Sequence, residues 1–578
     1  MGRGKMAGRK AMAKRPCTQV QIGHDVVATP SARTMLCPQP QDRSRRIGLT
    51  LAMFAVCFSI VTLRVLGLAW TGGESRAVTA DNTLTQTVMR PDIVDRHGTV
   101  LATDIVTASL FADAARVPHR GEAALRVSAV LPDMVPGTVQ DRLESGRRFV
   151  WLKRDLTPKQ QHAVHNLGVP GLGFRREHRR VYPNGHHASH LLGLVNIDNH
   201  GTAGMERYAD EEGLTAQGAP VALSIDLRVQ HAIRAELVSA MEEFSAKAAV
   251  GIVVDVRTGE VMGMSSLPDF DPNEPAAASR DTNARFNRAT LGVYEMGSIF
   301  KALTVAAALD SGQVTLADRY DARKPLKVSR FTIDDYHAKR RWLSVPEVFM
   351  YSSNIGTAQM ALDVGSEGYR GFLDRLGLLR RVSVELPEVG TPLVPAPWRE
   401  ISTMTISYGH GLSVTPLQMV SAAATLVNGG YAVKPTLLAQ KIMPKRGERV
   451  MSAATSRSVR ALMRLVVERG TGRKADVDGY PVIGKTGTAE KVQGGGYARR
   501  ALLTSFLSAF PANDPEFAML VMLDEPKGTK ATHGYATAGW NAAPVTARIV
   551  RRIAPLLGVQ PVGKWEIPVQ EARLMAFE

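Results

Sequence analysis

A serine and a lysine three residues apart form the first pair in this sequence that could carry out nucleophilic chemistry. The run Gly297-Ser298-Ile299-Phe300-Lys301 opens an apolar helical stretch that continues to Leu309. This spacing places Ser298 and Lys301 on one helix face, where the helix dipole favours negative charge on the serine oxygen and a neutral lysine could take its proton. Alone the pair proves little, because S-x-x-K occurs about once by chance in a chain this long and also describes a helix cap followed by a solvated lysine.

Two later motifs make the pair more specific. Ser352-Ser353-Asn354 lies between two apolar helical stretches, and Lys485-Thr486-Gly487-Thr488 lies in a strand-like run. Each alone also fits a cap or a turn. In chain order, however, S-x-x-K at a helix start, S-x-N between helices and K-T-G on a strand are the set that penicilloyl-serine-forming enzymes require.

The elements that must position these motifs can be read from hydropathy. Residues 249–256 and 260–266 predict two strands joined by a tight turn, and residues 481–492, 501–510 and 516–523 predict three more. Helical periodicity fills the interval, including 298–309 and 345–362, and a last helix is expected over 544–557. We therefore expect an α+β domain, with one antiparallel sheet, a helical insert and a cleft between them.

Charge argues against nucleic acid as a partner. The chain of 578 residues has a formal net charge of +17, but residues 1–46 hold ten Lys/Arg against Asp25 and Asp42, and the span that follows adds only Arg64. A charge of +8 remains for the 508 residues after Trp70, which is mildly basic rather than a phosphate-binding surface. The expected partners therefore include no nucleic acid.

An apolar segment near the N-terminus predicts a membrane anchor. Residues 47–63 carry no charge, and with 64–70 they form a helix of about 36 Å, enough for a hydrocarbon core of roughly 30 Å. Arg43, Arg45 and Arg46 precede it, so the positive-inside rule places the N-terminus in the cytoplasm and the rest beyond an inner membrane crossed once. The absence of cysteine after Cys57 suits an oxidising compartment entered without disulfides, although it also fits cytoplasm. A cleaved signal peptide and a buried core helix are the alternatives.

Composition divides the chain into parts. We predict a basic cytoplasmic tail over 1–46, a transmembrane helix over 47–70, a stalk and an α+β pedestal module over 71–235, a catalytic domain over 236–562 and a C-terminal tail over 563–578. The pedestal module shows short strand-like runs and turns but no set of residues with obvious chemistry. No internal repeat is present.

Several runs resemble those of a known family, the class B penicillin-binding proteins, and within it the division-specific FtsI type. In the catalytic domain the resemblance rests on the three motifs and on DVRTGEVMGMSSLPDFDPN and YGHGLSVTPLQM, and in the pedestal on RPDIVDRHGTVLA, RRVYPNGHHASHLLG and GMERYAD. Met296 and Pro91 depart from residues common in relatives, and neither is a reacting group. Asn354 favours division over the elongation relative, which commonly carries aspartate there. The resemblance implies a penicillin-binding transpeptidase fold with a five-stranded antiparallel sheet flanked by helices, preceded by a transmembrane helix and the pedestal.

The resemblance also implies a reaction and roles for residues. Ser298 would attack the D-Ala-D-Ala bond of a peptidoglycan stem peptide and pass the acyl group to an amine, with Lys301 as base, Ser352 as proton relay and Asn354 holding the peptide amide. Lys485 would supply positive potential. The expected substrate-binding residues are Thr486, Gly487 and Thr488, and backbone N–H groups of Ser298 and Thr488 would form the oxyanion hole. We expect Gly487 to be glycine because a side chain would obstruct the substrate along the strand.

Other implied partners are β-lactam antibiotics, the membrane, an FtsW-type glycosyltransferase and other division proteins, with the catalytic domain in the periplasm and no cofactor. Three alternatives stay open: an elongation-type transpeptidase, a serine enzyme that hydrolyses or senses β-lactams, and a non-catalytic division scaffold. Glu295 precedes Ser298 by three residues, but this spacing alone gives it no geometry for a hydrolytic base.

Two apparent metal sites are interpreted as structural. His186, His187 and His190 fall in a pedestal motif without accompanying Asp, Glu or Cys. The run from Asn196 to Gly201 resembles a calcium loop only faintly, because its twelfth position is Arg207 rather than glutamate. No metal is expected.

Overall fold

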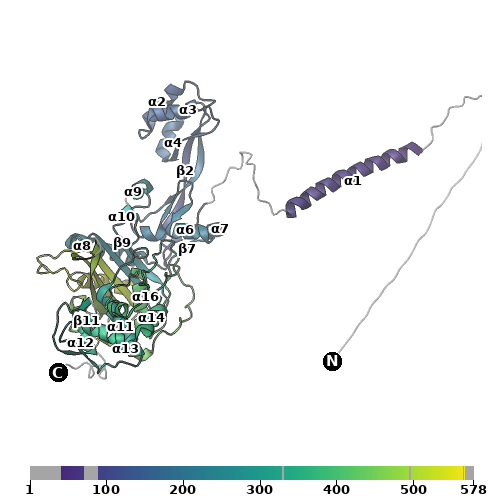
Figure 1. Cartoon of the computed structure of the whole chain (residues 1–578). Helices are drawn as coiled ribbons and strands as arrows, with labels where there is room; N and C mark the ends of the chain where they lie inside the picture. The colour runs from purple at the N-terminus through teal and green to yellow at the C-terminus, as the bar shows by residue number, and fades with distance from the viewer. Residues whose placement is uncertain are drawn as a thin grey trace, which may run out of the picture. The chain divides into compact units, whose positions relative to one another are not determined.

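The computed structural model describes residues 41–70, 89–280, 282–328, 331–493, 496–563 and 565. These fall into two compact units, Met1–Thr85 and Gln86–Glu578. The predicted tail 1–46, the stalk 71–89 and the C-terminal tail 563–578 lie mostly outside the described residues. The fold of the second unit is α+β, as predicted (Figure 1).

The first unit contains one described helix, α1 (Gln41–Trp70), which includes the predicted membrane span. The side chains at 41–47, 50 and 65–70 lie outside the described part. Within what is described, no helix is both long enough and apolar enough to cross a membrane.

The pedestal is built around one long strand. β2 (Val100–Ala112) pairs antiparallel with β4 (Leu172–Val181) along ten residue pairs, and its other edge is shared by β1 (Ile93–Val94) and β3 (Val150–Leu156). β7 (Val221–Ala222) pairs parallel with β1 and completes the sheet. At one end a small apolar core packs against this sheet. The helices near this core are α2 (Arg120–Val130), α3 (Pro136–Glu144) and α4 (Pro158–His165).

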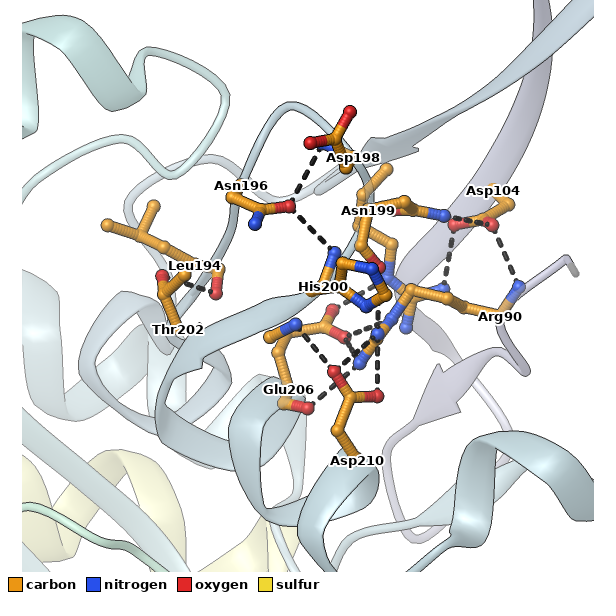
Figure 2. A network of polar contacts seen from close by, with 12 residues as sticks. Arg90, Asp104, Leu194, Asn196, Asp198, Asn199, His200, Thr202, Glu206 and Asp210 are labelled. Atoms are coloured by element: carbon orange, nitrogen blue, oxygen red, sulfur yellow. Dashed lines mark hydrogen bonds and ion pairs between the residues drawn. The ribbon is translucent and has the colours of Figure 1, made fainter. Parts of the chain in front are cut away.

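The other end of the pedestal is held by a buried ion cluster (Figure 2). Every side-chain nitrogen of Arg90 donates: to Glu206 at 3.0 and 2.8 Å, to Asp210 at 2.7 Å and to the Asn199 carbonyl at 2.9 Å. Arg180 of β4 shares Glu206 at 2.6 Å. Glu206 and Asp210 belong to α6 (Gly204–Glu211), so the cluster joins the chain's entry into the pedestal to that helix. The remaining elements here are α5 (Ser189–Leu192), β5 (Leu194–Val195), β6 (Gly201–Ala203) and α7 (Leu214–Gln217).

The catalytic domain has the predicted five-stranded antiparallel sheet, in the order β14-β15-β16-β8-β9. Its strands are β8 (Ala248–Asp255), β9 (Val261–Leu267), β14 (Ile483–Gln493), β15 (Gly496–Phe510) and β16 (Phe517–Asp524). β8 and β9, early in the chain, meet the later strands through the β16–β8 pairing. The K-T-G strand, β14, therefore forms one edge.

Both faces of the sheet are covered, which explains why β8 and β16 are nearly continuous apolar runs. One face packs against α8 (Leu227–Glu243) and α18 (Ala542–Leu556). The other face packs against the main core with α11 (Phe300–Asp310), α16 (Pro416–Val427) and α17 (Ala453–Glu468). The last helix was predicted within two residues of α18.

The helical insert places the S-x-N motif between two helices, as its position in the sequence predicts. These are α12 (Val345–Met350) and α13 (Asn354–Val364), separated at 351–353 within the apolar stretch 345–362. The rest of the insert comprises α14 (Ser366–Arg375), α15 (Glu400–Ser407) and short strands β10 (Arg319–Asp321), β11 (Leu326–Val328), β12 (Phe331–Ile333) and β13 (Trp342–Ser344). Short helices α9 (Pro275–Arg280), α10 (Thr282–Arg285), η1 (Gly297–Ile299) and η2 (Arg473–Ala475) complete the domain.

Candidate active site

Ser298 lies in the short turn η1 that leads directly into α11. The preceding Gly297 has φ +58°, a left-handed conformation that favours glycine. A Cβ there would lie 3.0 Å from the Thr488 carbonyl oxygen. The turn Gly297–Ile299, called the nucleophile turn below, therefore packs directly on the K-T-G strand. α11 is buried on nearly every side, which fixes the position of the turn at its start.

Lys301 is fully buried and its Nζ has four oxygen neighbours. They are the Ser352 carbonyl at 2.6 Å, Asn354 Oδ1 at 2.7 Å, Ser352 Oγ at 3.0 Å and Ser298 Oγ at 3.1 Å. Burial lowers the pKa of Lys301 well below its usual value, and the nearby Lys485 lowers it further, against an opposing contribution from Asp335. Lys301 is therefore placed to act as a neutral amine.

Ser352 lies between two lysines. Its Oγ is 3.0 Å from Nζ of Lys301 and 3.0 Å from Nζ of Lys485, and its backbone has φ +59°. That left-handed conformation is uncommon for a residue with a side chain, so the surrounding contacts must maintain it. Lys485 also donates to the Thr486 carbonyl at 3.0 Å, and burial lowers its pKa to about 7.

Asp335 holds the S-x-N turn and was missed in the sequence. Its carboxylate accepts from Ser353 Oγ at 2.7 Å and from the backbone N–H groups of Asn354 at 2.5 Å and Ile355 at 3.0 Å. The Asp334 carbonyl accepts from the Asn354 side-chain amide at 2.9 Å. Asp335 thus occupies the anion-favouring start of α13 from a distant loop. No spacing rule links it to the motif, so the sequence held no usable signal.

The K-T-G strand presents its threonines to different partners. Thr486 Oγ1 lies 2.6 Å from Thr471 Oγ1, and Thr488 Oγ1 accepts from the Ala538 backbone N–H at 3.2 Å. Because that bond uses the Thr488 oxygen as acceptor, its hydroxyl proton can still be donated to a ligand.

The structure gives Gly487 a reason different from the one expected. A Cβ at this position would lie 2.5 Å from Ser505 Oγ, 2.8 Å from the Ile299 side chain and 2.9 Å from the Met296 carbonyl oxygen. A side chain at position 487 would therefore collide with the protein itself rather than with the substrate. Gly487 lets β14 approach the nucleophile turn, and this brings the backbones of Ser298 and Thr488 close together.

The residues considered for metals make ordinary polar contacts. His186 pairs with Asp269 at 3.3 Å, His187 Nε2 lies 2.8 Å from His231 Nδ1, and His190 Nε2 donates to the Ala284 carbonyl at 2.7 Å. In the 196–201 loop, Asn196 Oδ1 accepts from the backbone of the loop itself. Among the residues that the structure describes, no three His, Cys, Asp or Glu side chains are grouped to hold a metal.

Comparison with known proteins agrees with this geometry. Residues 249–551 match the model of the penicillin-binding protein transpeptidase domain, and residues 85–216 match that of the penicillin-binding protein dimerisation domain. The probable peptidoglycan D,D-transpeptidase FtsI of Caulobacter vibrioides is 41% identical over 546 residues, 91% of each chain. The peptidoglycan D,D-transpeptidase FtsI of Escherichia coli K12 is 28% identical, over 92% of this chain and 96% of that one.

A solved structure shares the fold. The crystal structure of penicillin-binding protein 3 from Mycobacterium tuberculosis in complex with aztreonam matches with a TM-score of 0.64 and 24% identity, over 82% of this chain and 98% of that one. The sheet, the three assembled motifs and the family matches define a penicillin-binding transpeptidase. With its dimerisation domain and its similarity to the Caulobacter protein, the chain belongs to the class B penicillin-binding proteins of the FtsI type.

Proposed function

We propose that this protein is a peptidoglycan D,D-transpeptidase that cross-links stem peptides through an acyl-enzyme on Ser298. The observation that carries the proposal is the set of contacts around Lys301. A neutral amine has two N–H bonds and one lone pair, and the Ser352 carbonyl and Asn354 Oδ1 can only accept hydrogen bonds. These two acceptors, at 2.6 and 2.7 Å, use both N–H bonds. The lone pair is left for a hydroxyl group, and Ser298 Oγ lies 3.1 Å away.

In acylation, Lys301 takes the Ser298 proton while Oγ bonds to the carbonyl carbon of the penultimate D-Ala. The backbone N–H groups of Ser298 and Thr488 stabilise the oxyanion, worth roughly 3–4 kcal/mol per donor in comparable sites. The C–N bond then breaks, and the proton passes from Lys301 through Ser352 Oγ to the departing D-Ala amine. Ser352 suits this relay because it contacts Lys301 and Lys485 at equal distances of 3.0 Å.

In the second half-reaction, an amine of a neighbouring stem peptide attacks the ester carbonyl. Its proton returns through Ser352 and Lys301 to Ser298 Oγ as the ester bond breaks, which restores the resting enzyme. Lys485, Thr486 and Thr488 bind the carboxylate of the donor peptide, and Asn354 holds its amide. A β-lactam imitates the donor and forms the same ester, so it inhibits covalently.

The cellular role follows from the family. The FtsI names of the Caulobacter and E. coli relatives support cross-linking during septal wall synthesis. An FtsW-type glycosyltransferase and other division proteins are proposed as partners on the family resemblance alone. Asn354 also supports a role in division, because the elongation-type relatives commonly carry aspartate at this position.

Residues 47–70 are proposed as the single inner-membrane anchor, with the N-terminus cytoplasmic and the catalytic domain periplasmic. The sequence supports this with an uncharged run behind Arg43, Arg45 and Arg46. In α1 the described large apolar side chains between Leu49 and Leu63 are 58–75% exposed, which is the surface that lipid would cover.

Gel labelling with fluorescent penicillin tests the proposal. The full chain in detergent should be labelled, and Ser298→Ala should not be. A fragment of residues 71–578 should be soluble and label like the full chain, since Gln86–Glu578 is a compact unit. Labelled Ser298→Ala would overturn the nucleophile, and an unlabelled but folded wild type would favour a non-catalytic scaffold.

A further inference from the structure

The nucleophile turn is in direct backbone contact with a second turn, Tyr408-Gly409-His410-Gly411. The Gly297 N–H donates to the Gly409 carbonyl at 3.2 Å. A Cβ on Gly409 would lie only 2.0 Å from the Gly297 carbonyl oxygen, so the two turns meet without any intervening side chain. The second turn follows α15, where the Ser407 carbonyl accepts from Thr304 Oγ1 of α11 at 2.7 Å.

Glu295 makes a second connection between the same two turns. Its Oε1 accepts from the Gly411 backbone N–H at 2.8 Å, and its Oε2 lies 3.6 Å from Nδ1 of His410. The side chains are 18% and 26% exposed, respectively. Gly411 itself is exposed, so the two contacts lie at the partly exposed edge of the site, beside the buried backbone contact between Gly297 and Gly409.

These contacts bear on the reacting groups through one peptide unit. The Ser298 N–H, an expected oxyanion donor, belongs to the Gly297–Ser298 peptide. Gly297 has φ +58°, and glycine has no side chain to restrict that dihedral. The orientation of the Ser298 N–H and Oγ thus depends on the contacts that hold Gly297. Displacement of the 408–411 turn would remove one of them, the hydrogen bond from the Gly297 N–H to the Gly409 carbonyl.

We propose that Glu295 is a positioning residue for acylation. It holds the 408–411 turn against the nucleophile turn and thereby fixes the direction of the Ser298 N–H and Oγ. This inference rests on the proposed transpeptidase function. It assigns Glu295 no proton transfer, because its carboxylate is engaged by the Gly411 N–H and by His410 rather than by Ser298.

His410 provides a reporter of this arrangement. Burial lowers its pKa, whereas the neighbouring carboxylate of Glu295 raises it. The lowered pKa disfavours an ion pair between His410 and Glu295, so the Gly411 hydrogen bond is the contact that the substitutions at position 295 test. Glutamine at position 295 can keep that bond through its carbonyl oxygen, whereas alanine cannot.

The test measures benzylpenicillin acylation of the full chain by stopped flow, separating the acylation rate constant from the binding constant. Glu295→Ala should lower the rate constant at least tenfold while binding changes less than threefold, since only the transition state uses the oxyanion donors. Glu295→Gln should restore the rate constant to within threefold. By NMR, Glu295→Gln should also lower the pKa of His410, because the neighbouring carboxylate charge is gone.

Glu385→Ala is the matched control. Glu385 also accepts from a backbone N–H, that of Leu437 at 2.8 Å, and from Thr436 Oγ1 at 2.5 Å. It should lower thermal stability without changing the acylation rate constant. An unchanged rate constant in Glu295→Ala, or an equal loss in both alanine variants that follows their loss of stability, would overturn the inference. Failure of the proposed function is distinguishable, because then the wild type would not acylate or Ser298→Ala would.

Discussion

Nζ of Lys301 lies 2.7 Å from Oδ1 of Asn354, an atom that can accept a hydrogen bond but not donate one. With the Ser352 carbonyl at 2.6 Å, this uses both protons of a neutral amine. In the proposed mechanism Asn354 therefore does more than hold the substrate amide, because it also orients the lone pair of Lys301. An aspartate at the same position would instead favour a charged lysine.

Lys301→Arg should lose at least a thousandfold in the penicillin acylation rate. A guanidinium keeps the charge but does not deprotonate in the accessible pH range, so it cannot accept the serine proton. Stopped-flow acylation of the purified variant measures this. Acylation within tenfold of the wild type would show that position 301 acts through its charge.

Asp335→Ala should slow acylation at least tenfold and reduce the free energy of unfolding by roughly 1–3 kcal/mol, since the Asn354 and Ile355 N–H groups lose their acceptor. Asp334→Ala is the control, because Asp334 contributes only its carbonyl oxygen to Asn354. Acylation kinetics and thermal melts of both variants check this. Equal effects in the two would mean that the Asp335 carboxylate has no special role.

Gly487→Ala should lose most acylation because the added methyl group would meet Ser505, Ile299 and the Met296 carbonyl at 2.5–2.9 Å. Penicillin labelling, together with circular dichroism to verify folding, measures the effect. Combining it with Ser505→Gly removes the closest contact and should restore part of the activity. If the double variant were no better than the single one, the obstruction would lie on the substrate side, as the sequence alone suggested.

Acylation should fall on both sides of an optimum. Neutral Lys301 is lost as the pH falls through its lowered pKa, and positively charged Lys485 is lost as the pH rises through a pKa of about 7. The two lysines interact. The acidic and alkaline limbs of the pH profile of the second-order acylation rate constant therefore give pKa values that belong to the lysine pair in the free enzyme. Lys485→Arg should keep its charge and remove the alkaline limb. An alkaline limb that persists in this variant would assign it to another group.

The motif residues of the candidate site could be predicted from the sequence, but the residues that hold those motifs in position could not. Ser298, Lys301, Ser352 and Lys485 could be found because their chemistry requires fixed residue types within short motifs. Asp335 and the positioning role proposed for Glu295 could not, since both carboxylates accept from backbone N–H groups whose positions depend on the folded chain. The break at 351–353 could be anticipated, because the polar S-x-N motif interrupts the apolar residues that continue on both sides of the turn.

The sheet was predictable for a related reason. Buried strands such as β8 and β16 are apolar up to a final aspartate, so hydropathy alone predicts them. The role of Gly487 depends on the distance between β14 and the nucleophile turn, which only the tertiary structure provides.

The most direct test of the account is intact-mass spectrometry of the full chain after mixing with benzylpenicillin. In the proposed mechanism Lys301 and Ser352 complete acylation, but hydrolysis needs a water activated by a separate base, as a glutamate does in class A β-lactamases. We predict one stoichiometric adduct that persists for many minutes in the wild type and is absent from Ser298→Ala, whose unfolding free energy should change by less than about 0.5 kcal/mol. An adduct on Ser298→Ala, or return of the wild type to its unmodified mass within seconds as penicilloic acid accumulates, would contradict the account.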